Sequence, residues 1–517
     1  MEIEKNDSDG FTDPPEQRSH PMTHVSNNPA VARFAFDNTY ACELEGFYVT
    51  SKAAQVARPR LVKLNRELAE ELGLDAAALD SEEGARIFAG NETPEGALPL
   101  AQAYAGHQFG GFVPQLGDGR ALLLGEVIDR NGRRLDIQLK GSGPTPFSRT
   151  GDGRAALGPV LREYLIGEAM HALGIPTTRA LAAVLTGEPV FREGGALPGA
   201  VLTRVAASHI RVGTFQFFAA RGEQAKVRRL ADYVIERHYR ELKDHANPYL
   251  GLLERVCERQ AALIAGWMHV GFIHGVMNTD NMAISGETID YGPCAFMDHY
   301  DPATLFSSID THGRYAYANQ PKIAQWNLAR FAETLVPLID ADEKRAIARA
   351  TEVVHGFPEI YERYWLKGMR AKLGLVSDDE ADLNLATAFL TAMEGKNVDY
   401  TLAFRYLADA ALGEEEPIRA LFADPSVYDL WSGHWRARLS REAAAPLARA
   451  QAMRRVNPAF IPRNHRVEEV LSAAVERGEY APFETLLHIL SSPFEDQPEF
   501  AAFAEPPPEG YGHYRTF

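Results

Sequence analysis

The segment from His274 to Pro293 constrains the fold of this chain more than any other feature. It reads HGVMNTDNMAISGETIDYGP, so a histidine is followed by Asn281, a short apolar stretch and then Asp290 in Asp-Tyr-Gly. Amide and carboxylate oxygens are the ligands that Mg²⁺ prefers. If the chain turns back between Asn281 and Asp290, both side chains can reach one cation. This order of residues favours a metal-binding loop over two unrelated Asx turns.

The same spacing is found in the catalytic and metal-binding loops of protein kinases. The kinase residue that accepts the proton of the substrate hydroxyl is an aspartate two positions after the histidine. Here that position is Val276, which cannot accept a proton. Asp280 is the next carboxylate available as a general base. We expect His274 to brace the loop rather than to act as a catalyst.

Local patterns predict the secondary structure around this segment. Asn131-Gly132 separates two strand-like runs, 121–128 and 134–140, and indicates a hairpin. Further strands are expected at 180–186, 188–193, 200–206, 281–284 and 287–290. Helices are expected at 60–75, 158–173, 225–243, 250–270, 326–340, 342–355 and 357–373, and over much of the last hundred residues.

A small antiparallel sheet with one helix, followed by a long helical region, is typical of an α+β, protein-kinase-like fold with two lobes. We therefore divide the chain into five parts. They are a disordered tail (1–30), an N-terminal extension (31–100), a nucleotide-binding N-lobe (101–215), a C-lobe with the catalytic and metal loops (216–400), and a helical C-terminal extension (401–517).

A glycine-rich stretch precedes the predicted hairpin, and the hairpin ends in Lys140. The stretch reads YAGHQFGGFVPQLGDGR, and Gly119 lies 21 residues before Lys140, about the distance between a kinase glycine loop and its phosphate-binding lysine. A surface turn and a solvent-exposed lysine are the alternatives. In kinases, a glutamate on the following helix pairs with this lysine. Glu163 has the better spacing for that ion pair, and Glu168 is the alternative.

Arg204 and Arg211 occupy a region that holds the uncharged adenine ring in a kinase. Guanidinium groups suit phosphate, which they bind through two parallel hydrogen bonds. Arg120, Asp152 and Gly153 add further polar groups in glycine-rich sequence. Either arginine alone is also compatible with a solvent-facing loop. Together these residues indicate a nucleotide whose phosphates point toward this region.

The composition excludes several classes of protein. The net charge of −17 at pH 7 argues against nucleic acid or an anionic membrane as the main partner. Three cysteines are too few for a disulfide framework or a zinc site and favour a reducing compartment. No apolar run is long enough to span a membrane, and the first residues lack the pattern of a signal or transit peptide. We expect a cytoplasmic monomer.

Four stretches strongly resemble the selenoprotein O (SelO/YdiU) family, over residues from about 30 to the C-terminus. They are AYAGHQFGGFVPQLGDGRALLLGEV, RLDIQLKGSGPTPFSRTGDGRAALGPVLREYLIGEAMHALGIPTTRAL, RVAASHIRVGTF and HGVMNTDNM…DYGPCAFMD. Members of this family are similar to kinases but are protein adenylyltransferases. They bind ATP in a flipped orientation and transfer AMP to Ser, Thr or Tyr hydroxyls of other proteins.

The resemblance implies a role for each matching residue. Asp280 would be the proton acceptor, and Asn281 and Asp290 would bind Mg²⁺ or Mn²⁺. Nucleotide contacts would come from Gly117, Gly119, Arg120, Lys140, Asp152, Gly153, Arg204, Arg211 and Asp290. Relatives often end in a selenocysteine or cysteine, whereas this chain ends in HYRTF, so a C-terminal redox switch is in doubt.

Two other functions remain open from the sequence. One is a kinase-fold phosphotransferase that moves the γ-phosphate, and the other is a nucleotide-binding scaffold without catalysis. Intact metal ligands and Lys140 argue against the scaffold, and Val276 argues against the ordinary kinase. The sequence does not distinguish Mg²⁺ from Mn²⁺ or ATP from UTP, and it does not identify the target proteins.

Overall fold

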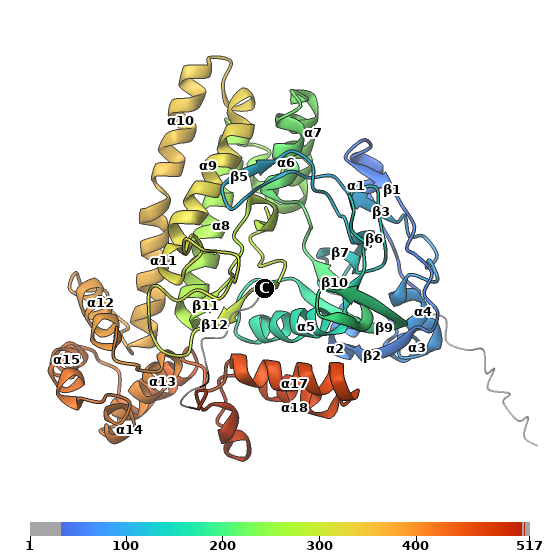
Figure 1. The fold of residues 1–517 in the computed structure, drawn as a ribbon. Coiled ribbons are helices and arrows are strands. Elements are labelled where there is room, and N and C mark those ends of the chain that lie inside the picture. The colour runs from blue at the N-terminus through green and yellow to red at the C-terminus, as the bar shows by residue number, and fades with distance from the viewer. Residues whose placement is uncertain (1–32, 509–510, 512–517) are drawn as a thin grey trace, which may run out of the picture. The chain divides into compact units, whose positions relative to one another are not determined.

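The computed structural model describes residues 33–508 and residue 511, which belong to one compact unit. The chain has a mixed α/β architecture in which one large sheet is followed by many helices (Figure 1). The mixed class expected from the sequence is therefore confirmed. The expected tail at residues 1–30 and the terminal HYRTF lie outside the described residues. No helix in the described part of the chain is long and apolar enough to cross a membrane.

The main sheet has eight strands, and all of its paired neighbours are antiparallel. Its order is β1-β3-β6-β7-β10-β9-β2, and β8 pairs with β10. The strands are β1 (Tyr48–Thr50), β2 (Arg60–Leu64), β3 (Leu100–Gln102), β6 (Ala121–Ile128), β7 (Arg134–Lys140), β8 (Ala155–Ala156), β9 (Arg179–Arg192) and β10 (Gly195–Ala206). The segment 31–100 thus adds three strands to the same sheet. A separate hairpin consists of β4 (Gly106–Gln108) and β5 (Gly111–Val113).

The β6–β7 hairpin lies where Asn131-Gly132 predicts it, and Gly132 has the positive φ of +77° that this turn requires. Two strand predictions need correction. The expected strands at 180–186 and 188–193 are one continuous strand, β9, because an irregularity opposite Pro198 and Ala200 accommodates the proline in the ladder. The helix expected over 60–75 is wrong at its start, where residues 60–64 pair with β9 as an edge strand.

The predicted helices are otherwise confirmed to within a few residues. The first part of the chain contains α1 (Thr39–Glu43), α2 (Arg66–Glu71), α3 (Ala76–Leu79), α4 (Glu82–Ala89), α5 (Leu157–Ala172), α6 (Val212–Ala219) and α7 (Gln224–His238). The long helices of the second part are α8 (Pro248–Val270), α9 (Gln320–Ile339), α10 (Glu343–His355) and α11 (Phe357–Lys372). The last part contains α12 (Asp382–Met393), α13 (Tyr400–Ala410), α14 (Glu416–Arg419), α15 (Pro425–Leu439), α16 (Pro446–Arg454), α17 (Asn464–Arg477) and α18 (Ala481–Leu490).

The strands expected at 281–284 and 287–290 are not formed. A short 3-10 turn, Thr279–Asn281, stands there instead, and the only local ladder pairs β11 (Phe272–Ile273) with β12 (Ala295–Phe296) within the described residues. The backbone of the loop bonds outward to other parts of the chain. Val212 N donates to Met282 O at 3.0 Å, and Ile284 N donates to Ile210 O at 2.9 Å. These bonds replace a ladder between the two segments.

The sheet has two different faces. Ile137 and Leu139 of β7 point into an apolar core that contains residues of α2 to α4. Gln138 and Lys140 alternate with them, so their side chains leave the opposite face of the strand. That face carries α5 and, beside it, the polar residues described below. Alternation along β7 therefore places Lys140 at the site.

The C-terminal helices support α5 from outside the sheet. In Figure 1, α17 and α18 run beneath α5, and both contact it. Arg162 of α5 forms an ion pair with Glu468 of α17 and donates to the carbonyl oxygen of Cys294 at 3.1 Å. Helix α5 is thus fixed both to the residue that follows the metal loop, Cys294, and to helix α17 near the end of the chain.

Candidate active site

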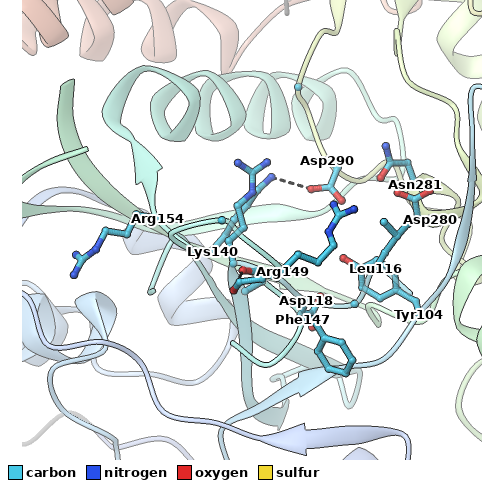
Figure 2. A pocket seen from close by; sticks show the side chains of 18 of the residues that line it. Tyr104, Leu116, Asp118, Lys140, Phe147, Arg149, Arg154, Asp280, Asn281 and Asp290 are labelled. Carbon is cyan, nitrogen blue, oxygen red and sulfur yellow. Dashed lines mark hydrogen bonds and ion pairs between the residues drawn. The ribbon is translucent and has the colours of Figure 1, made fainter. Parts of the chain in front are cut away.

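A cavity of about 790 Å³ opens where the sheet meets the loop 274–293. Seven of its lining residues are arginine or lysine and four are aspartate, in a chain whose net charge is −17. Such a local excess of positive charge suits a polyanionic ligand. The cavity brings together Gly117, Gly119, Arg120, Lys140, Asp152, Gly153, Arg204, Arg211, Asp280, Asn281 and Asp290. Figure 2 shows Lys140, Asp280, Asn281 and Asp290 among them.

Lys140 forms two ion pairs at the end of β7. Its Nζ lies 2.6 Å from Glu163 Oε2 and 2.8 Å from Asp290 Oδ1. Of the two glutamates considered from the sequence, Glu163 is therefore the partner. Glu168 lies on the same helix but binds Arg179, with 2.9 Å and 2.7 Å between their atoms. Burial is the main influence on Lys140 and lowers its pKa, and the nearby Arg204 adds to this effect.

Arg204 is fully buried on β10 and joins the same network. Its Nε lies 2.5 Å from Glu163 Oε1, and its terminal nitrogen bonds Asp290. Arg211 precedes α6, where its guanidinium lies 3.4 Å from Asp118 Oδ1 and 3.7 Å from Asp290 Oδ2. It also stacks over the Tyr104 ring at 4.3 Å. Both guanidiniums are therefore held in place by neighbours and line the cavity.

Asp290 is the centre of this network and adopts a left-handed backbone conformation, with φ +64°. Such a conformation is uncommon for residues other than glycine and is tolerated best by Asn and Asp. Burial opposes ionisation of the carboxyl, but Arg204, Lys140 and Arg211 outweigh it and hold the pKa of Asp290 well below its ordinary value. Asp290 is thus an anion, and three cations face it.

Asp280 has a different environment. Its side chain is buried, and burial raises the pKa of Asp280 to about 6. Gln108 Nε2 donates to Oδ2 at 3.2 Å, whereas Oδ1 has no hydrogen-bond partner among the described residues. The backbone of β4 packs against this carboxylate so closely that a Cβ at Gly106 would lie 2.2 Å from Oδ1. Asp280 therefore lines the cavity with Oδ1 packed against β4 and Oδ2 bonded to Gln108, and its pKa is suited to accepting a proton near neutral pH.

The loop that carries Asp280 and Asn281 is held rigidly. His274 has no exposed surface, and the Val276 N–H donates to its Nδ1 at 3.3 Å. Its Nε2 therefore carries the proton and donates to Ile289 O at 2.9 Å. Burial lowers the pKa of His274 and keeps the ring neutral. His274 thus braces the loop, as expected from the sequence, and does not line the cavity.

The geometry of Asn281 suits a cation. Its Nδ2 donates to Val276 O at 3.0 Å, which turns the amide oxygen away from that carbonyl. The amide oxygen of Asn281 and the carboxylate of Asp290 both line the cavity. No cluster of three or more His, Cys, Asp or Glu suited to a metal occurs in residues 33–508 and 511. A cation at Asn281 and Asp290 would therefore need further oxygen ligands from phosphate or water.

The glycine-rich segments bring backbone close to the cavity. Gly117 has φ +73°, and a Cβ there would lie 2.3 Å from the Phe147 ring. On the other side of the cavity, Asp152 accepts from Arg154 N at 3.0 Å and pairs with Arg192 at 2.8 Å. Arg192 holds the pKa of Asp152 below its ordinary value. Asp152 is thus more exposed to solvent than Asp280 and Asp290.

Several lining residues escaped the sequence analysis. Asp118 and Tyr104 hold Arg211, Gln108 bonds Asp280, and Arg192 pairs with Asp152. Asp118 stands between the two glycines of GDGR, so its place in the motif was a usable signal. Gln108 and Arg192 reach the cavity through the β4–β5 hairpin and the β9–β10 turn. No local pattern marks those positions.

The comparisons with known proteins agree with these motifs. The family model described as protein adenylyltransferase SelO matches residues 31–491. The chain belongs to the SelO family. It is 63% identical over 485 residues to the protein nucleotidyltransferase YdiU of Rhizobium leguminosarum bv. trifolii, which covers 93% of this chain and 97% of that protein. YdiU of Methylorubrum extorquens is 61% identical over 494 residues, covering 94% of this chain and 99% of the relative. This SelO-family chain is thus an enzyme of the nucleotidyltransferase class.

Proposed function

We propose that this enzyme transfers AMP from ATP to Ser, Thr or Tyr hydroxyls of target proteins and releases pyrophosphate. The observation that carries the proposal is the contrast between position 276, which holds a valine, and position 280, which holds a carboxylate. The position of the kinase base holds a valine, while a buried carboxylate whose pKa burial raises to about 6 lines the cavity four residues later. An ordinary kinase-like reaction has no base at position 276, whereas Asp280 supplies one for an acceptor that approaches from the β4–β5 hairpin.

The proposed layout is that of a kinase with a sheet lobe and a helical lobe, and the nucleotide lies reversed between them. In this proposal Arg204 and Arg211 take the place of the adenine site of a kinase, because guanidiniums favour phosphate over an uncharged ring. Lys140, Arg204 and Arg211 would then receive the β- and γ-phosphates, together with Arg120 and the backbone of Gly117, Gly119 and Gly153. The α-phosphate would lie near Asp280.

In the proposed reaction, Asp280 accepts the proton of the acceptor hydroxyl as its oxygen bonds to the α-phosphorus. The bond from that phosphorus to the bridging oxygen breaks, and pyrophosphate leaves with the bonding electrons. Asn281 and Asp290 fit a divalent cation, Mg²⁺ or Mn²⁺, which would neutralise phosphate charge when bound. Lys140, Arg204 and Arg211 would stabilise the charge of the departing pyrophosphate.

Two labels test the proposal. The protein is incubated with a protein acceptor, Mg²⁺ or Mn²⁺, and ATP labelled at either the α- or the γ-phosphate. We expect only the α label on protein, together with free pyrophosphate. Retention of the γ label would assign a phosphotransferase instead, and binding without either label would assign a scaffold. The Asp280→Asn variant is the matched control. A parallel reaction with α-labelled UTP and Mn²⁺ tests whether the enzyme distinguishes adenine from uracil.

A further inference from the structure

A groove next to Asp280 combines apolar and cationic side chains. The β4–β5 hairpin turns at Phe109 and Gly110, both with positive φ, and its tip faces the segment 309–323. A groove of about 550 Å³ lies there, lined by Phe109, Ile309, Asp310, Thr311, His312, Arg314, Asn319, Lys322 and Ile323. Phe109, Phe112 and Ile309 are 37%, 41% and 62% exposed, so large apolar side chains gather on this surface.

The groove is continuous with the catalytic loop. Phe109 N donates to Asn278 Oδ1 and to the hydroxyl oxygen of Tyr315, each at 3.2 Å. The preceding residue, Gln108, lines the large cavity and donates to Asp280. The β4–β5 hairpin therefore places Phe109, which lines the groove, directly after Gln108, which contacts the proposed base Asp280. A chain that lies in the groove has its next residues beside Asp280.

The two cations of the groove, Arg314 and Lys322, do not form ion pairs with its carboxylate, that of Asp310. Asp310 accepts from the N–H groups of Arg314 and Tyr315, at 2.9 Å and 2.8 Å, so its carboxylate caps the local backbone. The Arg314 guanidinium stacks over Trp326 at 4.7 Å. Within residues 33–508 and 511, neither Arg314 nor Lys322 forms an ion pair with a carboxylate. The groove therefore carries two cations and one carboxylate beside its apolar side chains.

We infer that this groove docks the acceptor polypeptide, as a segment that carries an acidic and an apolar side chain next to the hydroxyl that is modified. The acidic side chain lies at Arg314 and Lys322, and the apolar one packs on Phe109 and Ile309. The inference rests on the proposed transfer at Asp280 and adds the kind of acceptor that the enzyme selects. A combination of apolar anchor and charge complementarity sets partner choice at such surfaces.

Synthetic peptides test the groove directly. The probes are short peptides with a central serine and a neighbouring leucine, flanked either by two glutamates or by two lysines, and a third peptide in which glycine replaces the leucine. Binding is measured by fluorescence anisotropy, and transfer is measured with ATP labelled at the α-phosphate. We expect the glutamate–leucine peptide to bind about tenfold more tightly than the lysine peptide.

Two substitutions should change this preference without touching the nucleotide. Lys322→Glu should remove or invert the preference for glutamate, and Ile309→Ser should remove the preference for leucine. Each should raise KM for the glutamate–leucine peptide several-fold and leave kcat and ATP affinity unchanged, as expected for lost ground-state binding. The controls are Lys344→Glu, likewise an exposed lysine in the first turn of a helix, and Ile347→Ser, an exposed isoleucine outside the groove.

The two proposals fail in different ways. Equal binding of the glutamate and lysine peptides, or an unchanged KM in Lys322→Glu and Ile309→Ser, would overturn the docking surface even if AMP transfer is intact. Absence of the α label on every peptide, with the glutamate preference retained in binding and lost in Lys322→Glu, would overturn the transfer reaction and support the surface. A fall in both kcat and ATP affinity in Lys322→Glu would show a damaged site and also count against the docking surface.

Discussion

Lys140 Nζ lies 2.8 Å from Asp290 Oδ1, the same oxygen that accepts from Arg204. One carboxylate oxygen thus pairs with two cations in the ligand-free protein, and both cations also pair with Glu163. A metal ion that binds this oxygen competes with them, which leaves the two cations sharing the Glu163 carboxylate and favours the binding of another anion. The phosphates of a nucleotide supply such an anion. Metal and nucleotide should therefore bind cooperatively at this site.

This arrangement predicts the behaviour of Asp290→Asn. The variant should lose AMP transfer and the metal-dependent part of ATP binding, because the amide cannot replace a carboxylate that faces a cation. ATP binding without metal should be kept or strengthened, since the three cations lose one of the carboxylates that face them. Calorimetry with ATP, with and without Mg²⁺, measures both effects. Asp429→Asn, on the surface of α15, is the control, and full activity in Asp290→Asn would remove this residue from the site.

Asp280→Asn tests the proposed base. Among the described residues, Gln108 is the hydrogen-bond partner of this carboxylate, so the substitution changes little around it. We expect kcat to fall by about 10²–10⁴-fold, the usual contribution of a general base, while ATP affinity stays within a few-fold. Equal losses in kcat and ATP affinity would instead make Asp280 a ligand or a structural residue.

The pH dependence of transfer follows from the same side chain. Burial raises the pKa of Asp280 to about 6, and a base must be deprotonated to act. In the free enzyme, kcat/KM should therefore rise with pH through about 6 and level off above pH 7. The Asp280→Asn variant should lose this rise. A profile that is flat from pH 5 to pH 8 in the parent enzyme would contradict the assignment.

Arg211→Gln tests the reversed nucleotide. If Arg211 binds the terminal phosphates, the variant should bind ATP about tenfold more weakly, because a charge-assisted hydrogen bond contributes roughly 1.5–3 kcal/mol. AMP and adenosine should bind as they do to the parent. Arg204→Gln is a less selective test, since it also removes one of the two cations that Glu163 and Asp290 share. A uniform loss for all three ligands would favour the kinase-like orientation.

Lys372 gives a prediction about stability rather than catalysis. It is buried at the end of α11, with Nζ 4.1 Å from the centre of the Phe404 ring. Burial lowers the pKa of Lys372 from 10.5 to about 7, so the folded state holds its proton less tightly than the unfolded state. Burial of the charged Lys372 therefore lowers the free energy of unfolding. This loss of stability is complete below pH 7 and disappears as the pH rises through 10.5.

Lys372→Met should therefore stabilise the protein at pH 6 by up to a few kcal/mol, and the gain should shrink toward pH 10. Urea unfolding at a series of pH values measures the gain. Lys367→Met, at an exposed position on the same helix, should change little at any pH. A gain that is independent of pH would mean that packing, and not the charge, determines the effect.

The sequence predicted those parts of the site that local motifs encode. Lys140 could be placed because a hairpin with an Asn-Gly turn fixes which residue ends the second strand. The pairing of Glu163 rather than Glu168 followed only approximately from spacing, because the choice depends on how α5 is rotated against β9 and β10. That rotation is set by packing over many distant residues. Gln108 could not be assigned, since its contact to Asp280 joins segments that are 172 positions apart in the chain.

The strands expected at 281–284 and 287–290 show the same limit. Their apolar residues fit a strand, but their hydrogen-bonding partners lie near Ile210, Val212 and Pro176. The spacing of apolar residues in a sequence indicates which side chains are buried. It does not indicate which segment of the chain pairs with them. The error had no effect on the site, because the turn at Thr279–Asn281 still aims Asp280 and Asn281 at the cavity.

The ion pair between Arg162 and Glu468 joins residues 306 positions apart. A ribosome makes α5 early and α17 near the end of synthesis, so the helix that carries Glu163 emerges long before its outer support exists. The nascent chain then has a loosely held Glu163 and an incomplete set of contacts around Lys140. We therefore expect fragments truncated before residue 468 to lack the outer support of the helix that carries Glu163, and to be poor transferases.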